Sequence, residues 1–331
     1  MVGSQRYMSE FHAKSRKPWC IVVADDHGPE YVPSAAMEAR TSPVQYCRFG
    51  EPTTLLQKTL HRARHIAPTA QIAVAIRDQD REHWEPALWF VHPERRFISD
   101  TRMAASLTVT AAVLSIAAYS VSNVVTILPA RCYVANERIL AAALEQLHAT
   151  LPKIPEGVGT LGMIDIDEGV DEDYLLPCTT TMGAGLALQA VARQPAGWVA
   201  RYLRQRGAMV ASGILTGYAG VFAAHIFKYR STLAHTLIET TRMSSGRENL
   251  LSADAYRGLS RSMLCPLRWY PPTFAQRALR VYRCGWRGLR TARATSRISA
   301  SCPASGDPGS LKLTTVCAAT ADAILSEPLS D

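Results

Sequence analysis

Two histidines stand at the spacing that transition-metal ligands take on a helix. His61 and His65 are four residues apart, so on a helix they would share one face. Paired zinc ligands use this spacing, but those motifs also place a glutamate between the histidines. Arg62 and Arg64 stand there instead and add positive charge beside any cation. We therefore predict a solvated helix face and no metal ligands.

An acidic run over residues 165–173 has the composition of a calcium-binding loop. A loop of the EF-hand type needs glycine at its sixth position and glutamate at its twelfth. Val170 and Leu176 occupy those positions, counted from Asp165. The run is therefore predicted to be a solvated surface loop.

A series of arginines near the carboxyl end has helical spacing. Its members recur every three or four residues: Arg277, Arg280, Arg283, Arg287, Arg290, Arg293 and Arg297. On one continuous helix they would form a stripe able to contact phosphates. Gly285 and Gly288 interrupt that stretch, and a glycine costs about 1 kcal/mol relative to alanine in a helix. Polyanion binding through these arginines stays open as an alternative function, although nucleic acid is not an expected partner.

Several familiar catalytic motifs are absent from the chain. It has no GxSxG nucleophile elbow, no Walker A loop and no complete GxGxxG loop. Its eight cysteines include no pair at metal-binding or redox spacing. The amino-terminal segment also lacks an apolar core of signal-peptide length. Together these features predict a cytoplasmic protein with reduced thiols.

The composition is that of a moderately basic globular protein. Of 331 residues, 47% are hydrophobic and 19% charged, and the formal net charge is +8. A disordered chain needs low hydrophobicity with high net charge, so that class is excluded. We predict one domain over residues 18–296, with a polar basic tail at 1–17 and a low-complexity, disordered tail at 297–331.

Two uncharged stretches are long enough to cross a bilayer, which takes about 20 residues. They span residues 103–130 and 207–226, and in the second only His225 could carry charge. The first changes from an alanine-rich half to the β-branched run 124–128, which Pro129 follows. A helix followed by a buried strand fits this change better than a membrane span, because core elements of α/β proteins are uncharged all round. No membrane partner is expected.

Strands and helices alternate along the chain. Apolar runs predict strands at 19–24, 71–76, 124–128, 161–166 and 186–191. Apolar residues at helical spacing predict helices at 53–66, 104–119, 136–151, 197–205 and 221–238. This alternation predicts an α/β, Rossmann-like fold of three layers, in which helices cover both faces of a mixed, mostly parallel sheet.

Five short segments carry a resemblance to a known family. They are residues 19–28 (WCIVVADDHG), 43–47 (PVQYC), 54–63 (TLLQKTLHRA), 124–129 (VVTILP) and 207–213 (GAMVASG). In order and sequence they resemble sugar-1-phosphate nucleotidyltransferases, and among these the mannose-1-phosphate guanylyltransferases, over about residues 18–292. The resemblance implies the three-layer nucleotidyltransferase fold. It also implies a reaction that joins a nucleoside triphosphate to a sugar 1-phosphate and releases pyrophosphate, with Mg²⁺ across the phosphates.

The phosphate loop of that family is altered in this chain. The family pattern LAGGxGxR aligns with residues 23–30 (VADDHGPE). Asp25 and Asp26 stand at two of its glycine positions, and Glu30 stands at its arginine position. Backbone approaches a triphosphate closely only where side chains are small. Three carboxylates facing the phosphates would repel them.

Other reactive positions are altered as well. Val44 stands where the family's PKQ motif has its lysine, so a cation that would stabilise the transition state is missing. Arg131 stands at the metal-binding aspartate of LPxDH, and Gly288 at a second metal aspartate. No catalytic residue can therefore be assigned to this chain.

The resemblance implies remnants of a pocket. Ala24, Gly28 and Gln45 match nucleotide-binding positions, and Tyr174 and Gly213 match sugar-phosphate positions. We expect a family member with impaired or lost catalysis, and Mg²⁺ only if activity is retained. The alternative is a non-catalytic binding or regulatory protein on the same fold. Expected partners are a nucleotide or nucleotide sugar, and a second copy of the chain or an active relative.

Overall fold

The structure is a computed structural model that describes most of the predicted domain. The described residues are 18–25, 30–31, 42–48, 51–100, 105–134, 136–163, 173–177, 186–244, 246–251, 279–284 and 289–291. The two predicted tails, 1–17 and 297–331, lie outside the described residues, as does most of the acidic run 165–173.

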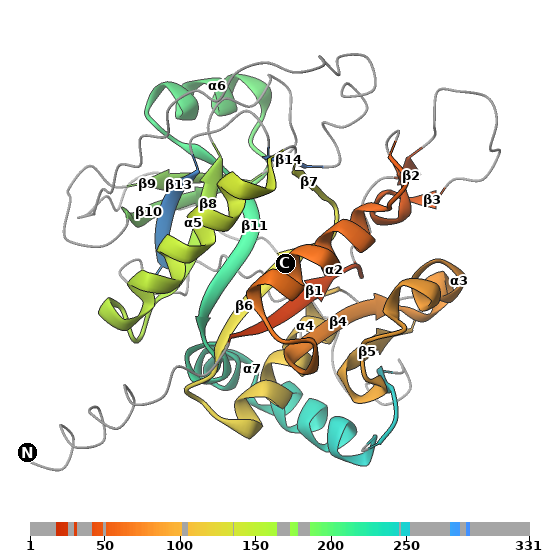
Figure 1. Cartoon of the computed structure of the whole chain (residues 1–331). Coiled ribbons are helices and arrows are strands. Elements are labelled where there is room, and N and C mark those ends of the chain that lie inside the picture. Colours follow the sequence, from red (N-terminus) through yellow and green to blue (C-terminus); the bar gives the residue numbers. More distant parts are fainter. Residues whose placement is uncertain are drawn as a thin grey trace, which may run out of the picture.

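A mixed sheet forms the centre of the molecule (Figure 1). Ten described strands build it: β1 (Trp19–Val23), β4 (Ile72–Arg77), β5 (Arg96–Ser99), β6 (Val124–Pro129), β8 (Val158–Met163), β9 (Tyr174–Pro177), β10 (Leu186–Ala192), β11 (Met209–Tyr218), β12 (Asn249–Leu251) and β13 (Leu279–Cys284). Their order is β12-β5-β4-β1-β6-β11-β8-β13-β10-β9. The first five strands in this order are parallel, and β11 runs antiparallel to β6, β8 and β9.

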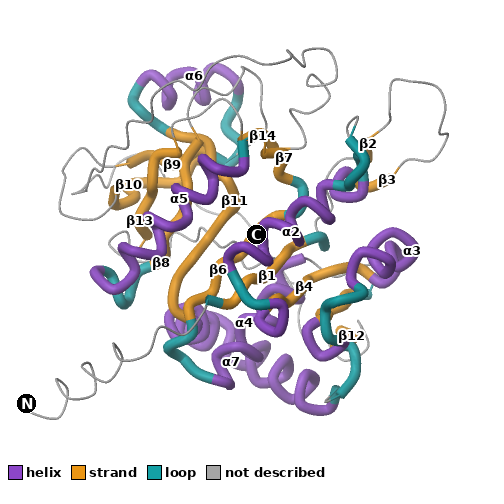
Figure 2. The backbone as a smooth tube through the Cα atoms, in the orientation of Figure 1, coloured by secondary structure: helices purple, strands orange, loops and turns teal. Residues whose placement is uncertain are grey.

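Helices cover both faces of the sheet and make three layers (Figure 2). α2 (Leu55–Ile66) and α5 (Glu137–Thr150) bury their apolar faces in one cluster with the sheet, and α6 (Gly197–Gln205) adds Ala200 to it. α4 (Ala105–Tyr119) and α7 (Ala219–Met243) pack into a second cluster on the other face. The predicted α/β fold with a mixed sheet is therefore confirmed.

Short elements complete the edges. β2 (Glu30–Tyr31) pairs with β3 (Ser42–Pro43), and β7 (Cys132–Val134) pairs with β14 (Leu289–Thr291). The short helices are α3 (Arg81–Trp84) and the 3-10 turns η1 (Val44–Tyr46), η2 (Thr69–Gln71), η3 (Asp78–Asp80), η4 (Glu85–Leu88), η5 (Pro93–Arg95) and η6 (Leu151–Lys153).

α2 shows why these residues form a helix. The Thr54 hydroxyl accepts a hydrogen bond from Gln57 N, and the Gln57 side chain accepts one from Thr54 N, which together make a capping box. Such a cap contributes about 1 kcal/mol. Leu56 and Leu60 are buried on the side that faces the sheet. The capped start and the apolar face thus determine which side of α2 faces away from the sheet.

The structure shows what the first uncharged stretch and part of the arginine series form. The first uncharged stretch is α4 followed by β6, as predicted, and none of the helices in the described ranges is both long and apolar enough to span a membrane. The described part of the arginine series does not form the continuous helix that a phosphate-binding stripe would need. Arg280 and Arg283 lie in β13, and Arg290 lies in β14, because this segment pairs with β8 and β7.

Candidate active site

The path of the chain places a candidate site at the carboxyl ends of β1 and β6. After β1 the chain passes through α2 to β4 and β5, on one side of β1. After β6 it passes through β7 and α5 to β8, on the other side. In open α/β sheets, ligands bind where the direction of connection reverses in this way. We call the carboxyl ends of β1 and β6 the switch point.

Two of the predicted nucleotide-binding residues meet beside the switch point. The Gln45 amide Nε2 donates to the Ala24 carbonyl at 3.0 Å, and Gln45 is buried. Ala24 N in turn donates to Ala75 O at 2.8 Å, which extends the pairing between β1 and β4. Gln45 therefore holds η1 against the end of β1. The third predicted residue, Gly28, lies outside the described residues.

The expectation that Asp25 faces bound phosphate is wrong. Its carboxylate is fully buried and accepts hydrogen bonds from Ser99 Oγ and Thr108 Oγ1, both at 2.8 Å. A buried carboxylate is tolerated only where donors replace its lost water, and these hydroxyls from β5 and α4 supply them. Asp25 thus ties the end of β1 to the layer behind the sheet. Asp26 lies outside the described residues, and only the backbone pairing of Glu30 is described.

Val44 and Arg131 lie close to the ends of the two switch-point strands. Val44 is 3% exposed within η1, next to the buried Gln45. Arg131 is partly exposed in the turn between β6 and β7. Ala130 N, one residue before it, donates to Val23 O at 2.8 Å, so this turn begins directly beside β1. Val44 is therefore a buried apolar side chain where the resemblance implies a lysine. Arg131 is a partly exposed cation where the resemblance implies an aspartate.

The two predicted sugar-phosphate positions are placed differently. Gly213 has φ of +74°, at an irregularity in the pairing of β11 with β8. A Cβ there would lie 2.9 Å from Pro129 Cγ, so glycine lets β11 approach the end of β6 closely. Tyr174 is fully buried in β9 and packs in the core shared with α2 and α5. Of the two, Gly213 borders the switch point and Tyr174 belongs to the core.

Sequence reasoning missed a buried ion pair at the carboxyl end of β4. Arg77 Nε donates to Asp80 Oδ2 at 2.9 Å and Arg77 Nη2 donates to Asp80 Oδ1 at 3.2 Å. Both side chains are buried. Burial, and then the nearby Asp80 carboxylate, raise the pKa of the Tyr46 hydroxyl above its usual range. An arginine and an aspartate three residues apart, directly after an apolar strand, were the available signal.

The described residues do not fit the Mg²⁺ ion that the resemblance implies. Among them, no three histidine, cysteine or acidic side chains gather to hold a metal ion. Asp25 accepts from two hydroxyls, and Asp80 is paired with Arg77. Gly288 lies outside the described residues. His61 and His65, on α2, are exposed as predicted, with their Nε2 atoms 3.0 Å apart.

Comparison with known proteins identifies the fold. No protein-family model matches the chain, and no curated protein matches it. A solved structure described as mannose-1-phosphate geranyltransferase from Thermus thermophilus has a TM-score of 0.62 at 20% identity, covering 82% of this chain and 75% of that one. One described as mannose-6-phosphate isomerase from Helicobacter pylori has a TM-score of 0.56 at 10% identity, covering 81% and 98%.

These likenesses confirm the resemblance read from the sequence at the level of the fold. The chain has the three-layer α/β fold of the sugar-phosphate nucleotidyltransferases. At 20% and 10% identity the likeness is one of fold.

Proposed function

We propose that this chain binds a nucleotide or nucleotide sugar at the switch point and that its nucleotidyl transfer is impaired or lost. The ligand class we propose is that of a mannose-1-phosphate guanylyltransferase, namely a guanine nucleotide and its mannose derivative. Two similar structures are named for enzymes of mannose phosphates, which supports this choice. We place the protein in the cytoplasm, in keeping with Cys20, Cys47 and Cys132, which in the described part of the chain are thiols and not disulfides.

The observation that carries the proposal is the combination of Val44 and Arg131 beside the described backbone of the switch point. The backbone there is held in place by Gln45, the Ala130–Val23 hydrogen bond and Gly213. A buried valine offers no charge to a transferring phosphoryl group, which depends on cations for its stabilisation. These contacts support a ligand-binding scaffold, while position 44 supplies no cation for phosphoryl transfer.

Arg131 changes what the site can bind. At a position where an aspartate would hold a metal ion, a guanidinium can contact phosphate oxygens directly. Nucleotide binding should then depend little on Mg²⁺. If turnover is fully lost, the chain is a non-catalytic binding or regulatory protein. It would then pair with a second copy of itself or with an active relative.

The experiment is thermal unfolding with GTP, GDP-mannose and mannose 1-phosphate, each with Mg²⁺ and with EDTA. A ligand at 100 times its dissociation constant adds about 2.7 kcal/mol to the free energy of unfolding. We expect a nucleotide-dependent rise in Tm that persists in EDTA, and no pyrophosphate release from GTP and mannose 1-phosphate. If no ligand raises the Tm of a cooperatively unfolding chain, the proposal fails.

A charge-reversed pair of variants makes the test specific. Arg131→Glu should remove the rise in Tm, because it places a carboxylate beside the phosphates. Arg206→Glu is the matched control, since Arg206 is an exposed arginine beyond α6 and should leave the rise unchanged. Rapid pyrophosphate release by the unmodified chain would overturn the claim of impaired transfer while leaving nucleotide binding intact.

A further inference from the structure

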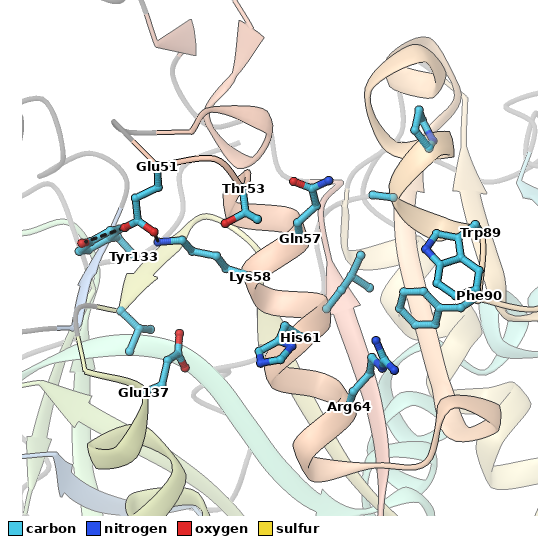
Figure 3. Close-up of a pocket in the computed structure, with 14 residues that line it drawn as sticks. Glu51, Thr53, Gln57, Lys58, His61, Arg64, Trp89, Phe90, Tyr133 and Glu137 are labelled. Carbon is cyan, nitrogen blue, oxygen red and sulfur yellow. Dashed lines mark hydrogen bonds and ion pairs between the residues drawn. The ribbon is translucent and has the colours of Figure 1, made fainter.

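A groove crosses the outward face of α2, on the side of the helix that faces away from the sheet (Figure 3). One wall is formed by η4 and the two aromatic residues that follow it, Trp89 and Phe90. The other wall is formed by Tyr133 of β7 and Glu137 at the start of α5. Its volume is about 620 Å³, which lies within the range of small-molecule pockets.

Basic side chains of α2 form the floor of the groove. Lys58, His61 and Arg64 are three residues apart, so they share one face of the helix. Lys58 is already neutralised, because it forms an ion pair with Glu51. Its ammonium nitrogen also lies 5.0 Å from the centre of the Tyr133 ring. This end of the groove has little charge left to attract a ligand.

The other end of the groove keeps its positive charge. Arg64 is exposed, and no carboxylate among the described residues pairs with it. The guanidinium carbon lies 5.3 Å from the centre of the Phe90 ring, a contact that orients the side chain without neutralising it. Glu137, the acid of the facing wall, is held by two hydrogen bonds from Arg62. An anion at this end would therefore find an uncompensated cation.

Trp89 supplies an aromatic surface beside that cation. Its side chain is 79% exposed, and its ring lies edge-on to Phe90 with the centres 5.6 Å apart. What distinguishes it is its place in a groove, where an exposed indole face can stack against a planar ring. Phe90 contacts both Arg64 and Trp89, so the groove holds a guanidinium and an exposed indole side by side.

We propose that this groove binds a small anion that carries a planar ring, of the nucleoside monophosphate class. Arg64 and the neighbouring His61 take the phosphate, and the base stacks on Trp89. The site is distinct from the switch point, because Leu56 on the opposite side of α2 packs into the core with the sheet. The concave shape favours a small molecule over a protein surface as the occupant.

The test is calorimetric titration of the full chain with AMP in EDTA. We expect binding that weakens at least about fivefold in both Arg64→Gln and Trp89→Ala, since each removes one of the two contacts. Two matched controls should stay within about twofold of the unmodified chain. Arg206→Gln also removes an exposed arginine above an aromatic ring, that of Tyr202, and Trp198→Ala removes a 75% exposed tryptophan.

Adenosine and ribose 5-phosphate, titrated separately, distinguish the two contacts. Trp89→Ala should affect adenosine, and Arg64→Gln should affect ribose 5-phosphate. AMP binding that is unchanged in both groove variants would overturn the proposal, because the ligand would then lie elsewhere. It is also overturned if AMP does not bind while sedimentation shows a self-association that Trp89→Ala abolishes, since the face would then be a protein interface.

Discussion

At the scale of single residues, the burial of Asp25 has the clearest consequence. Its carboxylate accepts hydrogen bonds from Ser99 and Thr108, and replacing it with alanine leaves both hydroxyls without this partner. We expect Asp25→Ala to lower the free energy of unfolding by about 2 kcal/mol or more, measured by urea denaturation. Asp25→Asn keeps one acceptor oxygen and should lose about half as much.

The same variant separates the two possible orientations of this side chain. A carboxylate facing bound phosphate would repel it, so its removal would strengthen nucleotide binding without loss of stability. A stable Asp25→Ala with tighter nucleotide binding would therefore contradict the buried arrangement. The sequence alone could not decide this, because Ser99 and Thr108 are 74 and 83 residues away along the chain.

At the scale of elements, the contact of β11 with β6 depends on Gly213. Alanine there would have a Cβ 2.9 Å from Pro129 Cγ and an unfavourable positive φ. We expect Gly213→Ala to cost at least about 2 kcal/mol in the free energy of unfolding. Gly207→Ala is the control for φ alone, since Gly207 has φ of +83° with nothing within 4 Å of its Cβ position. Equal losses in the two variants would show that the approach to Pro129 is unimportant.

Elements differed in how well the sequence predicted them, and the difference follows from how local their causes are. α2 was predicted from its threonine cap and the spacing of Leu56 and Leu60, all within one segment. The arginines have helical spacing, yet Arg280, Arg283 and Arg290 lie in β13 and β14, because the strand partners β8 and β7 are distant in sequence. The groove on α2 was missed for the same reason, since Trp89 reaches it from another segment.

At the scale of the whole molecule, two half-buried histidines on opposite faces of the sheet make stability depend on pH. His148 of α5 lies with Nε2 2.7 Å from Thr126 Oγ1 of β6, and burial lowers its pKa. His225 of α7, on the opposite face, has its pKa lowered by burial and then by Lys228. Both histidines are therefore neutral in the folded chain at pH values where the unfolded chain protonates them.

The sign of the resulting pH dependence follows from linkage. The folded pKa lies below the unfolded value, so the stabilisation is fully present above the unfolded pKa, about 6.5, and is lost as pH falls below it. Each histidine contributes a slope of at most about 1.4 kcal/mol per pH unit to the free energy of unfolding. We expect urea denaturation between pH 7 and pH 5 to show this loss, and His148→Gln to flatten it. His92→Gln is the control, because that side chain is exposed on a loop, and its slope should match the unmodified chain. A slope unchanged by His148→Gln would mean that His148 is protonated equally in both states.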